Sequence, residues 1–246
     1  MTDITADTSP GFPDSRHSFD LAPMEEPPSV WSVVSALLKQ PGRVLHELLH
    51  GRARAVLGAM LLVALVALAV YGCVVGSLKG GPQLWIAPAK ILLGSAVAAL
   101  ICLPSLFVFL CMNGADAKMR HVAGLLLASV CLMTVLLVSL APIAWVFSQS
   151  TSGVGFIATL HLVLWAVALW FGLRLLSNAA AKVWGPVSGR LGLWTCLYVV
   201  VCLQMMTALR PIIDETKTGS FLPQEKMFFL QHFGQTIGIV GNHDRD

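Results

Sequence analysis

Charged residues are scarce in this sequence. Asp, Glu, Lys and Arg make up 12% of its 246 residues, whereas a water-soluble domain carries about a quarter. Apolar residues make up 56%, and the mean hydropathy is +0.76. So few charges exclude a water-soluble surface over most of the chain. The composition therefore predicts an all-α, polytopic transmembrane helix bundle with polar extensions at both ends.

Catalytic patterns are also missing. The sequence has no HExxH, GxSxG or phosphate-loop pattern, and its six cysteines include no CxxC pair, so nothing indicates a catalytic, metal or redox centre. The net charge is only +3, with the basic residues at the edges of apolar runs, which argues against nucleic acid as a partner. We therefore predict no enzymatic activity, no metal site and no cofactor.

The first 28 residues lack the basic start of a secretory signal. Arg16 is their only Lys or Arg, against six acidic residues. They are rich in Pro, Ser, Thr and Asp and poor in aliphatic residues, so they cannot bury enough surface to offset the entropy of ordering. Residues 1–28 are predicted to form a disordered acidic tail.

Residues 29–51 show the spacing of amphipathic helices, with apolar residues three and four positions apart. Pro41 and Gly42 divide the segment into two helices, and Pro41 suits the first turn of the second. Polar side chains are expected on the opposite face of that helix, at Arg43, His46, Glu47 and His50. This segment is predicted to lie along the membrane surface.

Five apolar runs within residues 52–210 are each long enough to cross a bilayer, which takes about 20 residues. They are Ala55–Leu78, Ile91–Met112, Val122–Phe147, Val154–Leu175 and Leu191–Leu209. The flanks on the N-terminal side of the membrane hold nine Lys or Arg, against six on the other side, which places the N-terminus in the cytoplasm and the C-terminus outside. Residues 211–246 would form an external tail with one amphipathic helix. The expected location is a bacterial cytoplasmic membrane.

Ionisable groups in or beside the spans are the functional candidates, because burying them in hydrocarbon is costly. Lys90 is expected at the entrance of the second span, where its stem lets the amine reach the interface. His161 lies about two turns into the fourth span, where it would hydrogen-bond a neighbouring helix or bind a metal or haem. Arg210 follows the fifth span. Pro41 and Arg43 are candidates in the amphipathic segment.

Tryptophans and small residues complete the expectations for the bundle. The seven tryptophans fall mostly near span ends, as in an interfacial aromatic belt. Gly58 and Ala64 in the first span, and Gly94 and Ala98 in the second, would let helices approach closely.

The stretch Leu37-Leu38-Lys39-Gln40-Pro41-Gly42-Arg43-Val44, ahead of five closely spaced spans, resembles the opening of bacterial members of the Yip-type (Ypt-interacting protein) membrane family. The resemblance implies a cytoplasmic N-terminus, five helices and a non-enzymatic role; eukaryotic relatives are linked to small GTPases and vesicle traffic. Of possible functional residues, the resemblance points only to the region around Pro41 in this chain.

Two hypotheses of function follow. The first is a non-catalytic membrane scaffold that presents the acidic tail and the amphipathic helices to a membrane or cytoplasmic protein, with self-association also open. The alternative is the membrane subunit of an ABC-type transporter, a class that also begins with an amphipathic helix. A pathway for a polar solute needs polar lining, so this alternative fits a lipid-like substrate better. An electron-transfer or metal-handling protein that uses His161 is a third reading.

Overall fold

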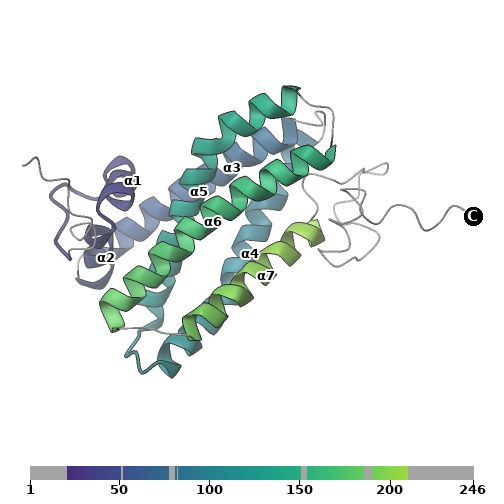
Figure 1. The fold of residues 1–246 in the computed structure, drawn as a ribbon. Coiled ribbons are helices and arrows are strands. Elements are labelled where there is room, and N and C mark those ends of the chain that lie inside the picture. The colour runs from purple at the N-terminus through teal and green to yellow at the C-terminus, as the bar shows by residue number, and fades with distance from the viewer. Residues whose placement is uncertain are drawn as a thin grey trace, which may run out of the picture.

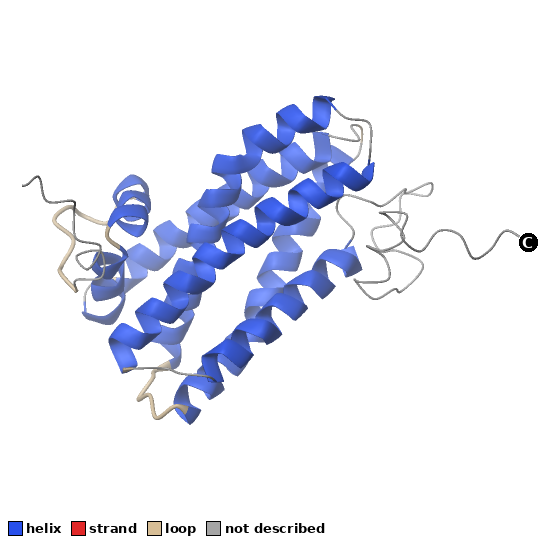
Figure 2. Ribbon diagram, viewed as in Figure 1, coloured by secondary structure: helices blue, strands red, loops and turns tan. Residues whose placement is uncertain are grey.

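The computed structural model describes residues 21–50, 52–77, 81, 83–150, 154–185 and 190–209. These ranges contain seven α-helices and no strand, which confirms the predicted all-α class (Figure 2). The helices are α1 (Val30–Lys39), α2 (Pro41–His50), α3 (Ala53–Ser77), α4 (Gln83–Met112), α5 (Met119–Ser150), α6 (Val154–Trp184) and α7 (Arg190–Leu209).

Four of these helices, α3, α4, α5 and α6, are long and apolar enough to cross a membrane. They have 25, 30, 32 and 31 residues, more than the roughly 20 that a bilayer needs. These four candidate spans suggest an integral membrane protein. The described apolar part of α7, Leu191–Met205, is shorter, so a fifth crossing stays a prediction.

The five long helices lie side by side, and α1 and α2 sit together at one end of the bundle (Figure 1). Helix α3 packs against α4 and α5, α5 packs against α6, and α7 packs chiefly against α4. A core of buried apolar side chains joins α3, α4, α5, α6 and α7; its fully buried members include Leu106, Leu110, Leu125, Leu176 and Trp194.

Residues 21–50, which we call the cap, fold onto the bundle end. The predicted break is confirmed, because α1 ends at Lys39 and α2 begins at Pro41, where a missing N–H costs nothing. Ser29 starts α1 with a capping box shared with Ser32. A second apolar core holds the cap on α3, α5 and α6; it includes Val33, Leu37, Val44, Leu48, Val56, Met60, Cys131 and Leu175.

The closest approach of α3 to α4 occurs at Gly72. A Cβ atom on Gly72 would lie 2.5 Å from the Cα atom of Pro88, so only glycine allows this contact. A Cβ on Gly58, one of the predicted contact positions, would meet no atom within 4 Å. The small residue that lets the two helices approach is therefore Gly72 and not Gly58, because Gly58 faces open space.

Candidate functional site

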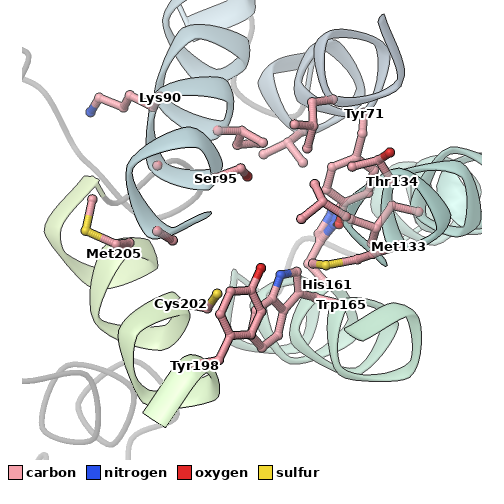
Figure 3. A pocket seen from close by; sticks show the side chains of 17 residues that line it. Tyr71, Lys90, Ser95, Met133, Thr134, His161, Trp165, Tyr198, Cys202 and Met205 are labelled. Carbon is pink, nitrogen blue, oxygen red and sulfur yellow. The ribbon is translucent and has the colours of Figure 1, made fainter. Parts of the chain in front are cut away.

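A cavity of about 90 Å³ lies within the bundle, lined by side chains from all five long helices. Its lining is mostly aliphatic and aromatic, with polar groups from Tyr71, Ser95, Thr134, His161 and Tyr198. Figure 3 shows these side chains arranged around the cavity, with α6 and α7 supplying His161, Trp165, Tyr198 and Cys202. The structure thus gathers more polar groups inside the bundle than the sequence pattern predicted.

His161 of α6 is buried at this cavity, with 1% of its surface exposed. The hydroxyl oxygen of Tyr71 in α3 lies 2.9 Å from its Nδ1 atom, which confirms the predicted hydrogen bond to a neighbouring helix. The two rings meet edge to face, with centroids 5.8 Å apart. Among the described residues, the Nε2 atom of His161 is buried and has no hydrogen-bond partner. One nitrogen of the imidazole is therefore available to a ligand.

Replacing Tyr71 by phenylalanine is expected to lower the free energy of unfolding by about 1 kcal/mol, since it leaves both nitrogens of His161 unpaired inside the bundle. Thermal unfolding in detergent measures this. The matched control is Ser139→Ala: the exposed Ser139 hydroxyl donates only to the carbonyl of Val135 in its own helix, so little change is expected. Equal losses in the two variants would contradict a stabilising role for the Tyr71–His161 bond.

Other hydrogen bonds between the long helices are found among the described residues. Ser129 Oγ donates to the backbone carbonyl of Gly172 across 2.6 Å, and Trp194 Nε1 donates to Ser105 Oγ across 3.1 Å. Trp194 is fully buried and stacks on Tyr198. It is therefore a core residue and not the interfacial anchor that its position suggested, because the start of α7 faces α4 there.

Lys90 lies deeper in a helix than its sequence position indicated. Helix α4 begins at Gln83, so Lys90 is about two turns inside it rather than at its entrance. The predicted span began at Ile91, but the largely apolar residues from Gln83 to Lys90 are helical as well, so α4 starts earlier in the chain. The side chain is buried, and Figure 3 shows its amine pointing away from the cavity that the residue helps to line.

Pro41 and Arg43 both act within the cap. Pro41 is the first residue of α2, as predicted. The Arg43 guanidinium pairs with the Glu25 carboxylate across 2.8 Å, and Met24 beside it is buried. The segment 21–28, predicted as part of the tail, thus packs against α2. Arg210, residues 1–20 and the predicted external helix lie outside the described residues.

Glu47 is the site residue that the sequence pattern missed. It was expected on the polar face of α2, but only 4% of its surface is exposed. Its Oε1 accepts from the Met24 N–H across 3.2 Å, and its Oε2 accepts from the Arg52 N–H across 3.0 Å. The Arg52 guanidinium lies 3.9 Å from the same Oε2. One carboxylate therefore joins the segment before α1, α2 and the start of α3, where the helix dipole also favours negative charge.

The cap should loosen in acid. The Arg52 N–H bond, aided by the Met24 N–H and against the effect of burial, holds the pKa of Glu47 below its usual 4.5. A lowered pKa in the folded state means that the carboxylate stabilises the fold above 4.5, and that this contribution is lost as the pH falls through the lowered value. Thermal unfolding from neutral pH to below 4.5 measures it. In Glu47→Gln this part of the pH dependence should vanish, and its persistence would count against the assignment.

A metal or haem centre at His161 finds no further ligands in the described ranges. These residues contain no group of three or more His, Cys, Asp or Glu side chains placed to hold a metal ion. Their cysteines, among them the cavity residue Cys202, are all free thiols. The buried Nε2 atom of His161 can make one hydrogen bond to a bound molecule.

Comparisons of the chain with protein-family models, with curated proteins and with solved structures found no significant match. The Yip-type resemblance accordingly stays a prediction.

Proposed function

We propose that this chain is a non-catalytic integral membrane scaffold whose bundle anchors the cap and whose cap binds a protein partner. One observation carries the proposal: the cap is fixed to the bundle, yet it leaves an apolar face of α1 uncovered. Trp31 is 80% exposed and Leu38 50%, and they lie on one face of α1 because they are seven residues apart. The side of α1 with Val33 and Leu37 is already buried against the bundle.

The polar surroundings of this face favour a protein over the lipid surface. A shallow groove beside it is lined by Glu25, Glu26, Lys39 and Arg43, and Glu25 is 80% exposed. Charges of both signs thus lie side by side here, and a protein surface can complement such a mixed pattern with its own acidic and basic groups. The partner we propose therefore has an apolar contact patch with both acidic and basic residues at its rim.

The basic residues of the chain support a cytoplasmic position for the cap. Those near the cap end of the bundle are Arg52, Arg54, Lys118, Arg120, Arg174 and Lys182. Positively charged flanks stay on the cytoplasmic side. With α7 as a fifth span, the C-terminus would lie outside a bacterial cytoplasmic membrane, which is also what the Yip-type resemblance implies.

The test is site-specific photo-crosslinking in native membranes. A photoreactive residue at position 31 or 38 should capture the same protein, and one at Leu65, an exposed apolar position on α3, should not. The variant Trp31→Ala should reduce capture at position 38. Adducts with lipid alone at positions 31 and 38 would overturn the proposal.

The transporter alternative has one observation in its favour, the cavity that all five long helices line. In that case an ATPase would dock at the cap end, on the turn between α4 and α5, and the mainly apolar lining would suit a lipid-like substrate. Purification in a mild lipid-preserving detergent separates the two proposals. A stoichiometric ATPase would favour the transporter, and a non-ATPase partner bound through α1 would favour the scaffold.

A further inference from the structure

The unpaired nitrogen of His161 is the starting point. Its Nδ1 atom is hydrogen-bonded to the Tyr71 hydroxyl, while its Nε2 atom is buried without a hydrogen-bond partner among the described residues. A buried polar atom without a partner costs about 1–3 kcal/mol, and in a bilayer no bulk water relieves that cost. His161 also lines the cavity. The buried Nε2 atom therefore indicates that a bound molecule supplies its missing hydrogen-bond partner.

The size of the cavity limits what fits. At about 90 Å³ it is larger than the ~15 Å³ that one water needs, but smaller than the ~150 Å³ engineered cavity that accepts benzene. A row of waters would need two to four polar partners each, and the walls are mainly apolar, with Leu68, Val130 and Leu137 among them. A narrow aliphatic chain fits this space better than water or a ring.

The position of the cavity points to the bilayer as the source. Tyr71 lies six residues before the end of α3 and His161 seven residues after the start of α6, which places both about 10 Å along the helix axes from the bundle end opposite the cap. With that end of the bundle level with the membrane surface, both side chains lie just inside the headgroup layer, which is about 5–8 Å thick on each side. Helices α6 and α7 both line the cavity, through Trp165 and Tyr198, although α7 packs chiefly on α4. A chain of the kind proposed below would therefore enter between α6 and α7.

We propose that the cavity binds one acyl chain of a membrane lipid, with the ester carbonyl oxygen of that chain accepting a hydrogen bond from His161 Nε2. This hydrogen bond requires the tautomer in which the Tyr71 hydroxyl donates to Nδ1 and the imidazole proton is on Nε2, because a carbonyl oxygen needs a donor. Met133 and Leu137 of α5 and Ile91 of α4 then contact the methylene groups. The site lies in the half of the bundle away from the cap, so it is independent of the scaffold proposal.

The experiment uses the full chain in phosphatidylcholine vesicles that contain a small fraction of phosphatidylcholine with a diazirine on one acyl chain. After illumination, mass spectrometry maps the labelled residues. Label is expected on cavity-lining residues such as Met133 and Trp165. In His161→Leu, cavity labelling should fall about fivefold, the effect of one neutral hydrogen bond, while His161→Gln, which keeps a donor, should retain most of it.

A second variant keeps the test decisive if His161→Leu fails to fold. Ala98 is buried and lines the cavity, so Ala98→Phe should fill the space and abolish cavity labelling. Val66 is exposed on the outer face of α3, and Val66→Phe is the matched control, expected to leave cavity labelling unchanged. Label confined to outward-facing residues such as Leu100, or equal labelling in His161→Leu and the native chain, would overturn the proposal.

Discussion

Replacing Glu47 by alanine is expected to loosen the cap, although its apolar core still holds it against the bundle. The substitution removes the acceptor of the Met24 and Arg52 N–H groups, and hydrogen bonds to a charged group contribute about 1.5–3 kcal/mol each. We expect a loss of about 2 kcal/mol in the free energy of unfolding of the cap, because water can reach part of the exposed N–H groups. Limited proteolysis within residues 21–52 should become faster, and the bundle should stay folded.

The control for Glu47 is Glu25→Ala in the same cap. The Glu25 side chain is 80% exposed in its pair with Arg43, and exposed ion pairs contribute less than about 1 kcal/mol. Proteolysis of the cap should therefore change little. If both variants were cleaved at the same rate as the native chain, the buried carboxylate would not hold the cap.

This variant also connects stability with the proposed function. A cap loosened by Glu47→Ala would no longer present Trp31 and Leu38 on a fixed surface. Crosslinking of the partner at position 38 should then decrease together with the protection of the cap, whereas lipid labelling of the cavity at His161 should persist.

The second large effect is expected at Gly72. Gly72→Ala would bring a Cβ atom to 2.5 Å from the Cα atom of Pro88, so α3 and α4 must separate. Overpacking of this kind costs about 1–3 kcal/mol, and because the neighbour is backbone rather than a flexible side chain we expect about 2 kcal/mol or more. Thermal or SDS-induced unfolding of the purified protein measures the change.

The same substitution elsewhere on the same helix is a direct control. A Cβ atom on Gly58 meets no atom within 4 Å, and alanine favours helix over glycine by up to about 1 kcal/mol. Gly58→Ala should therefore be neutral or stabilising. A destabilisation of similar size at both positions would mean that the cost reflects helix α3 itself and not its contact with α4.

The candidate spans were predictable because a long apolar run in a bilayer forms an α-helix. A segment such as Ile91–Met112 must form a helix to satisfy its own backbone groups, and α4 does contain it. The break at Pro41 was equally local, since proline cannot continue the preceding helix. Four of the five predicted spans are found as candidate spans, with different bounds, as for α6, which continues to Trp184. Hydropathy does not mark where a helix leaves the apolar layer, and the fifth crossing stays a prediction.

One part of the site, the hydrogen bond of His161, was predictable from the sequence. An imidazole inside an apolar helix usually makes a buried hydrogen bond, and His161 makes one. Its partner Tyr71 is 90 positions away in the chain, and no local pattern joins the two. For Glu47 the sequence predicted the wrong environment. Helical spacing placed it on the polar, solvent-facing side of α2, but Met24 and the turn to Arg52 pack against that side and bury it.

Composition, run length and proline act locally, so they were enough to predict an all-α chain with long apolar helices and a helix pair ahead of them. Which polar groups meet, and where space remains, follows from the tertiary packing. Glu47 depends on how the segment before α1 and the start of α3 pack on α2, and Gly72 and the cavity at His161 depend on how α3, α4, α5, α6 and α7 pack. That packing rests on contacts between residues far apart in the chain, which hydropathy and periodicity do not encode.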